Sequence, residues 1–285
     1  MELPMTATIH TGHSATDQTR FIKPRDRSHE IADALATDWL DNNAFLTAFF
    51  NTMSITFPVG EKFFIDSVRH YRGDIIDLAL LQNIKGFCGQ EGFHRREHQR
   101  YNEQLCAARG YDLEILEGAM TRRLRWAQKK LPPLTNLGVT VAIEHLTAVL
   151  SEQLLGNDSV MDKADPAMRE LWRWHAAEEM EHKAVAFDVF LAVGGSDKLR
   201  KSCLRRASFF LIFELLRGLT YMLKADGHLF SVSQWRQGLK ALFGKSGVFA
   251  GAWESYREFY QDGFHPWQQD THAMLEKWES ETLPA

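Results

Sequence analysis

Two parts of this chain carry the same order of metal-binding residue types, a glutamate followed by a Glu-x-x-His motif. The upstream glutamate precedes its motif by 30 positions in the first copy and by 35 in the second, about one helical hairpin. The first copy consists of Glu61, Glu91 and His94, and the second of Glu144, Glu179 and His182. In a four-helix bundle this order can bring four carboxylates and two imidazoles to one point, the ligand set of a dinuclear metal site. One such motif is common by chance, whereas two matched copies predict a shared metal centre.

Helical phase adds a histidine to each ligand face. Positions i, i+3, i+4 and i+7 lie on one side of a helix. His98 therefore shares the face of Glu91, and His175 shares the face of His182. We expect His98 and His175 to lie within reach of the centre, either as a third nitrogen ligand or as residues that orient a ligand.

Two neighbours of the predicted ligands are further candidates. Glu178 competes with Glu179 for the ligand position on its helix, and the Glu-x-x-His spacing favours Glu179. His145 directly follows Glu144, so its side chain is rotated by about 100° around the helix axis from that of Glu144. We expect His145 to support a ligand or to lie in the core.

The alternative is that these residues form solvated helix faces with paired charges. This explanation suits Arg95, Arg96 and Glu97, which lie in a run of charged residues. It suits Glu61 and Glu144 less well, because both lie in apolar stretches. A buried carboxylate is costly unless it is paired or binds a cation, so we favour the metal centre.

Helices must position these side chains, because helical periodicity dominates and no segment shows the alternation of a strand. Pro58 is expected to kink or restart the first long helix, and Asp74 to cap the second. Gly110 should end the second helix, and Asp165 with Pro166 should open the helix of the second motif. The expected helices cover residues 38–72, 74–109, 112–130, 134–155 and 165–193, followed by helical segments at 199–225, 231–243, 247–261 and 266–281.

The predicted organisation has three parts: a flexible segment at 1–30, a metal-binding bundle at 31–195, and a helical extension at 196–285 that packs on the bundle. The first part has no apolar run typical of a secretory signal. Residues 207–225 are apolar, but Glu214 and Arg217 interrupt them. We expect no transmembrane span there, while a peripheral membrane contact stays open.

Composition limits the class of protein. The net charge of −4 gives no sign of a nucleic-acid partner. The three cysteines form no C-x-x-C pair and suggest a reducing, cytoplasmic location. The chain has 19 Phe and 8 Trp, many of them after residue 195. These aromatic side chains could line a pocket near the metals for an apolar small-molecule substrate, join helices together, or form a homodimer interface.

The residue types also indicate the metal. A site rich in carboxylates with a few imidazoles suits iron or manganese, whereas zinc prefers fewer ligands and more nitrogen or sulfur. We therefore expect two ions, with iron first, manganese or a mixed manganese/iron pair next, and zinc last.

At these residues the chain resembles a bacterial family of ferritin-like helical proteins described as predicted metal-dependent hydrolases. The stretches that carry the resemblance are 57–64, 90–98, 144–148, 174–183 and 263–267, within a region from about 40 to 270. The resemblance implies an all-α, ferritin-like four-helix bundle with additional C-terminal helices. It also implies metal ligands among the six residues of the two copies, none of which departs from the pattern. The sequence indicates no role for the motif His265-Pro266-Trp267.

Two functions fit a dinuclear non-haem site. The first is an oxygen-activating di-iron oxidase or oxygenase that uses dioxygen on a small apolar substrate. The alternative is a metal-dependent hydrolase that uses a metal-activated water, since the sequence has no Gly-x-Ser-x-Gly elbow for nucleophilic hydrolysis. Iron storage is a third function, against which the long aromatic C-terminal part argues. Ligand composition leads us to favour oxygen chemistry narrowly over hydrolysis.

Overall fold

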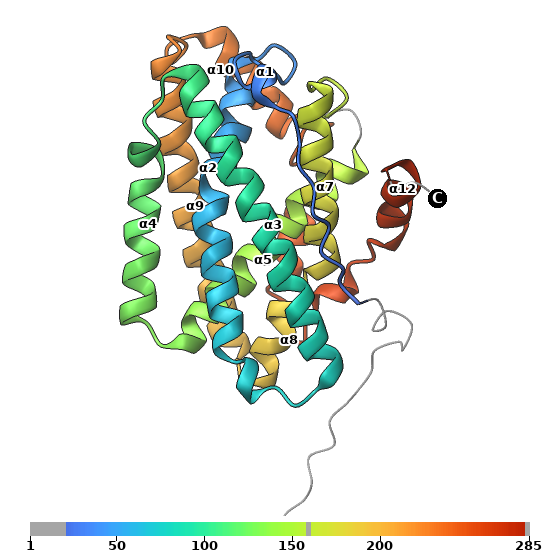
Figure 1. The fold of residues 1–285 in the computed structure, drawn as a ribbon. Coiled ribbons are helices and arrows are strands. Elements are labelled where there is room, and N and C mark those ends of the chain that lie inside the picture. The colour runs from blue at the N-terminus through green and yellow to red at the C-terminus, as the bar shows by residue number, and fades with distance from the viewer. Residues whose placement is uncertain (1–20, 158–160, 283–285) are drawn as a thin grey trace, which may run out of the picture.

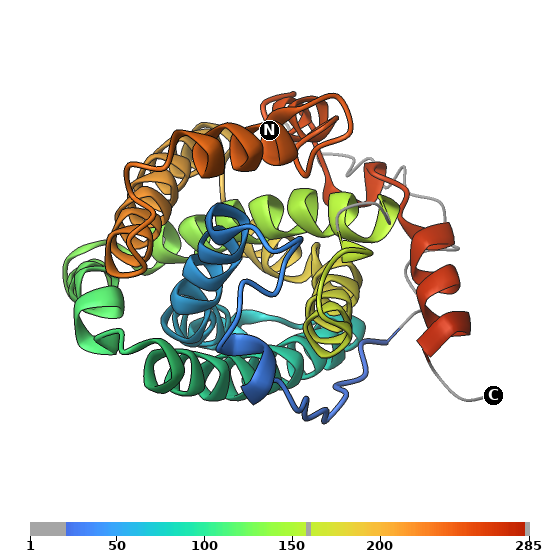
Figure 2. The same ribbon diagram turned by 90° about the horizontal axis from the view of Figure 1, so that it is seen from above.

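The computed structural model describes residues 21–157 and 161–282, and within these residues the regular structure is helical without a strand. The predicted all-α class is therefore confirmed. Its long core helices are α2 (Ala44–His70), α3 (Leu78–Arg109), α5 (Pro133–Gly156) and α7 (Pro166–His182). Helix α2 packs along α3, and α5 packs along α7 (Figure 1). Seen from above, α2 lies inside a ring of other helices (Figure 2). A specifically ferritin-like arrangement stays a prediction.

Local signals in the sequence set several helix ends. Gly110 follows α3 with φ at 68°, in the left-handed region that glycine adopts readily. Asp165 caps α7 by accepting from the main-chain N–H of Ala167 at 2.9 Å, and Pro166 occupies the first helical position. The expected cap at Asp74 is wrong: a short 3-10 helix, η1 (Arg72–Asp74), comes first, and Asp77 caps α3 instead.

Pro58 lies inside α2, which continues through it as a single helix from Ala44 to His70. The helix therefore does not restart there, one of the two outcomes that the sequence left open. Proline has no main-chain N–H, so the carbonyl of Ser54, four residues earlier, receives no helical hydrogen bond from it. Instead, Asn102 of α3 donates its Nδ2–H to this carbonyl at 3.0 Å.

The predicted single helix over 165–193 is wrong, because the chain breaks just after the second Glu-x-x-His motif. Helix α7 ends at His182, and α8 (Val185–Ala192) begins after two intervening residues. At the break, the buried ammonium of Lys183 donates to the carbonyl of Gln269 at 2.6 Å. Local helix propensity is weak enough for such tertiary contacts to override it.

The remaining helices surround the core helices. Helix α9 contacts α5 and α2, and α12 contacts α5 and α7. The outer face of α9 exposes Phe209, Phe210 and Phe213. These surrounding helices are α1 (Ala32–Leu35), α4 (Leu113–Lys130), α9 (Asp197–Ala225), α10 (Val232–Phe243), α11 (Ala252–Glu258), η2 (Pro266–Gln268) and α12 (His272–Thr282). The division of the chain at residue 195, and a homodimer through the aromatic side chains, stay predictions.

Residues 21–31 form an extended segment, here called the strap, that runs between α3 and α7 (Figure 1). Gln90 of α3 donates to the carbonyl of Lys23, and Arg25 pairs with Glu181 of α7 at 2.7 Å. The sequence assigned residues 1–30 to a flexible segment, of which 1–20 lie outside the described residues. The strap joins the two helices that carry the Glu-x-x-His motifs.

One helix among the described residues, α5, is long and apolar enough to cross a membrane by length and composition. Of its most apolar window, 67% is buried inside the protein. The same helix carries Glu144 into the core. These features are typical of a core helix.

Candidate metal centre

The structure brings the six predicted ligands together from four helices. All six are at most 3% exposed: Glu61 on α2, Glu91 and His94 on α3, Glu144 on α5, and Glu179 and His182 on α7. Each helix turns this part of its surface toward the others, so the carboxylates and imidazoles share one interior site. The two sequence copies are therefore neighbours in space.

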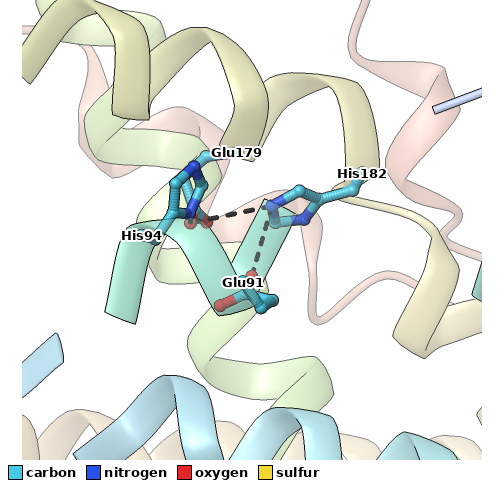
Figure 3. A group of neighbouring side chains, drawn as sticks. All are labelled: Glu91, His94, Glu179 and His182. Carbon is cyan, nitrogen blue, oxygen red and sulfur yellow. Dashed lines mark ion pairs between the residues drawn. The ribbon is translucent and has the colours of Figure 1, made fainter. Parts of the chain in front are cut away.

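His182 connects ligands from both copies. Its Nε2 lies 3.2 Å from Oε1 of Glu91, and its Nδ1 lies 3.1 Å from Oε2 of Glu144. Oε1 of Glu179 lies 3.8 Å from the same Nε2. Figure 3 shows dashed ion-pair lines from the His182 ring to Glu91 and to Glu179. Carboxylates therefore surround both nitrogens of this ring.

His94 has a different environment. Its Nε2 lies 3.1 Å from Oε2 of Glu178, and its Nδ1 lies 3.5 Å from Oε1 of Glu179. Arg25 of the strap donates to the other oxygen of Glu178 at 3.2 Å. Burial opposes ionisation of Glu178, but His94 and Arg25 together hold its pKa below the usual value. Glu178 therefore orients the imidazole of His94 from its outer side, while Glu179 lies on the inner side.

Two overlapping groups of ligand atoms lie close enough to share a metal ion. Atoms of Glu91, His94, Glu179 and His182 lie within 4.8 Å of one another, and so do atoms of Glu61, His94 and His175. His94 belongs to both groups. The overlap is consistent with two neighbouring ions rather than two separate sites.

Unpartnered oxygens test whether a metal fits here. Both carboxylate oxygens of Glu61 and of Glu91 are buried without a hydrogen-bond partner among the described residues. The same holds for Oε1 of Glu144, Oε2 of Glu179 and Nδ1 of His94. Buried polar atoms are costly when they lack partners, and buried charges are normally paired or bound to metals. Hard divalent cations would satisfy these oxygens, so the donor set fits a metal pair.

The pKa shifts at the centre also indicate that its carboxylates lack enough positive charge nearby. Burial raises the pKa of Glu61 and of Glu91 well above the usual value, and raises that of Glu144 to about 7. Burial alone would lower the pKa of His94, but the hydrogen bond to Glu178 and the nearby negative charges of Glu178 and Glu179 raise it to about 10. Clustered carboxylates in a dry interior favour any nearby positive charge.

The additional histidines have different positions. His175 lies at the centre, with Nε2 3.1 Å from Oε1 of Glu179. His98 lies behind it, with Nε2 2.8 Å from Nδ1 of His175. His145 instead packs against Phe259, with ring centroids 4.6 Å apart. Burial lowers the pKa of His145 to about 3.

No metal-binding sequence pattern pointed to three residues that support these side chains, Arg25 and Ser54 by direct contact and Asn102 through Ser54. Arg25 lies in the segment that was expected to be loose, and Ser54 and Asn102 carry no metal-binding signature. Only Ser54 had a detectable signal, because it lies four residues before a proline inside a helix. Arg25 had no local signal, since its partners lie more than 150 positions away.

The apolar pocket predicted beside the metals stays a prediction. One surface cavity is lined by residues between Glu254 and Gln261 of the C-terminal part. A second, very small cavity lies between α2, α4 and α9, near Thr52, Met120 and Gly218. Neither cavity is lined by any of the six predicted ligands.

Comparison with known proteins gives one match. The model of a family described as predicted metal-dependent hydrolase matches residues 23–270. This region contains all six predicted ligands and the strap from Lys23 onward. No curated protein matches the chain, and no solved structure does.

Proposed function

This chain belongs to the family of predicted metal-dependent hydrolases, and from that premise we propose that it is a dinuclear metal enzyme that hydrolyses a small-molecule substrate. The observation that carries the proposal is the group of buried carboxylate oxygens without hydrogen-bond partners. Carboxylates without a cation would destabilise the fold at this point. Their concentration at one site is therefore best explained by bound metal.

The geometry suggests how the chain would hold the ions. We assign Glu61 and His94 to one ion, and Glu91, Glu144 and His182 to the other. Glu179, whose Oε1 lies near both His94 and His182, would complete the ligand set. When bound, such a pair lowers the pKa of water and polarises a scissile group. The chain itself contributes orientation: Glu178 accepts from His94 Nε2, so that Nδ1 faces the centre.

A second candidate function is oxygen activation, and the donor set is the observation that favours it. Carboxylates outnumber imidazoles, and none of the three cysteines, all free and buried, belongs to either group of ligand atoms. Such a set suits iron or manganese better than zinc. Under this proposal the protein would be a di-iron oxidase or oxygenase, with dioxygen as co-substrate. The family match supports hydrolysis, so oxygen activation ranks second.

Metal analysis is the first test. Protein purified from cells supplied with iron, manganese and zinc should contain about two ions per chain. Glu144→Ala should lose most of this metal, whereas Glu152→Ala, on the same helix and bonded to Ser255, should keep it. Metal-free wild-type protein that cannot be loaded would contradict the proposal.

The second test separates the two reactions. The metal-loaded protein would be assayed against ester, amide and phosphoester panels, and the reduced iron form would be mixed with dioxygen. Hydrolysis that disappears in Glu144→Ala supports the first function. Rapid dioxygen consumption with a change in the iron absorption spectrum, and no hydrolysis, would replace it with the second.

A further inference from the structure

A chain of buried polar side chains leads from the candidate metal centre into the core beside α2. It passes through Asn102, Ser54, His98, His175 and Glu179, all at most 4% exposed. Successive members lie 2.7, 2.8, 2.8 and 3.1 Å apart. Each distance is that of a hydrogen bond. Because the members are buried, the hydrogen atoms in this chain must be arranged consistently from one end to the other.

At the end of this hydrogen-bonded series that lies farthest from the centre, the donor and the acceptor of each hydrogen bond can be assigned. The series begins at the main-chain carbonyl of Ser54, which lacks a helical partner because Pro58 has no N–H. A carbonyl can only accept, so Asn102 must turn its Nδ2–H toward it, at 3.0 Å. The other amide atom, Oδ1, then faces Ser54 Oγ at 2.7 Å and accepts its hydrogen.

The same assignment of donors and acceptors continues through both histidines. Ser54 has used its only hydrogen, so its Oγ accepts from His98 Nδ1 at 2.8 Å. A neutral imidazole carries one N–H, which leaves His98 Nε2 to accept from His175 Nδ1. The two hydrogen-bond partners of the His98 ring, Ser54 and His175, are uncharged in this arrangement, and no carboxylate among the described residues hydrogen-bonds to the ring, which supports the neutral form.

At the end of the series nearest the centre, this assignment leaves a lone pair on His175 that faces Glu179. With its hydrogen on Nδ1, neutral His175 directs the lone pair of Nε2 at Oε1 of Glu179, 3.1 Å away. Two lone pairs at this distance repel unless a proton or a metal ion lies beside them. Ligand atoms of His175, His94 and Glu61 also lie within 4.8 Å of one another.

We propose that Ser54, Asn102 and His98 are positioning residues that hold His175 as a third imidazole ligand of the centre. The ion on this side would then have His94 and His175 as nitrogen ligands, together with Glu61. The inference rests on the metal centre of the proposed function but not on the reaction that it performs. Groups that fix the tautomer and orientation of a metal-binding histidine typically change metal affinity about 10- to 100-fold.

The experiment uses full-length protein loaded with Mn²⁺ alone. Pulsed EPR on protein with ¹⁵N-labelled histidine detects directly bound imidazole nitrogens, and chelator competition gives metal affinity. In the wild type we expect nitrogen couplings from His94, His175 and His182. His175→Gln should lose one of them. Ser54→Ala should weaken Mn²⁺ binding by about tenfold or more.

Ser67→Ala is the matched control, because it removes the same hydroxyl from the same helix. Ser67 is buried, and its hydroxyl forms hydrogen bonds with Thr140 and with the carbonyl of Phe64. It does not belong to the hydrogen-bonded series that leads to His175. Its affinity should equal that of the wild type, and circular dichroism should show that both variants keep their helices.

Three outcomes would overturn the inference. Unchanged nitrogen couplings in His175→Gln would exclude His175 as a ligand while leaving the metal centre intact. Equal affinities of Ser54→Ala and Ser67→Ala would exclude the positioning role. A wild type that binds no Mn²⁺, iron or zinc would overturn both the inference and the proposed function.

Discussion

The two copies of the Glu and Glu-x-x-His pattern are alike in sequence but differ in what lies behind them. In the first copy, His94 has Glu178 on its outer nitrogen, and Arg25 holds Glu178 in turn. In the second copy, both nitrogens of His182 face carboxylates, those of Glu91 and Glu144. One histidine is therefore supported from outside the centre, and the other lies wholly among its carboxylates.

The difference teaches that a repeated motif fixes where donors lie but not what each donor does. The outer support of His94 comes from Arg25 of the strap and Glu178 of α7, and neither of these two residues belongs to the repeated pattern. We therefore expect two inequivalent metal positions. The position near His94 and His175 is richer in nitrogen, and the position near Glu91 and Glu144 is richer in carboxylate.

The largest expected effect comes from removing one carboxylate from each copy. Glu144→Ala should remove most of the metal while much of the helix content remains, as measured by metal analysis and circular dichroism. Glu61→Ala should preferentially empty the nitrogen-rich position, because Glu61 groups with His94 and His175. Full metal occupancy in Glu144→Ala would rule this residue out as a ligand. Identical losses in the two variants would argue against inequivalent positions.

Removing the outer support of His94 should have a smaller effect. Arg25→Gln leaves Glu178 without its cation, so we expect metal affinity to fall by about tenfold. The change should appear in the signals of the nitrogen-rich position first. Arg27→Gln is the control, because Arg27 lies in the same strap but pairs with the exposed Glu170. If both variants behave alike, the strap acts only as a cover.

The smallest effect should come from two glycines of α3, of which Gly89 lies against the strap and Gly92 faces open space. Gly92 has no neighbouring atom that an added Cβ would meet, so Gly92→Ala should stabilise α3 by about 0.5–1 kcal/mol. At Gly89 an added Cβ would collide with Pro24 of the strap. Gly89→Ala should therefore lack this gain and displace the strap. Urea unfolding measures the free energy of unfolding of both variants. Equal values would show that the strap can move aside without lowering the stability of the fold.

Sequence alone predicted the features that have local causes. The end of α3 at Gly110 and the start of α7 at Asp165 follow from single residues with strong conformational preferences. The neighbourhood of the six charged and imidazole side chains followed from helical phase and hairpin length. Whether these six residues bind metal stays a prediction.

Features with distant causes could not be predicted in this way. The break after His182 accompanies the contact of Lys183 with Gln269, 86 positions away. Helix α3 is capped by Asp77 rather than Asp74, although both aspartates are plausible caps. The role of Arg25 depends on carboxylates of α7 that only the folded chain brings near it.

The strap also has a consequence for the order in which the protein matures. Arg25 leaves the ribosome early, yet its partners Glu178, Glu181 and Glu279 are synthesised much later. Trp278, whose ring the Arg25 guanidinium covers, is likewise made long after Arg25. The strap therefore cannot reach its final position until α12, which carries Trp278 and Glu279, has been synthesised. We expect the nascent protein to take up metal while the site is still uncovered, so that finished apo-protein loads more slowly than Arg25→Gln in a stopped-flow measurement of metal uptake.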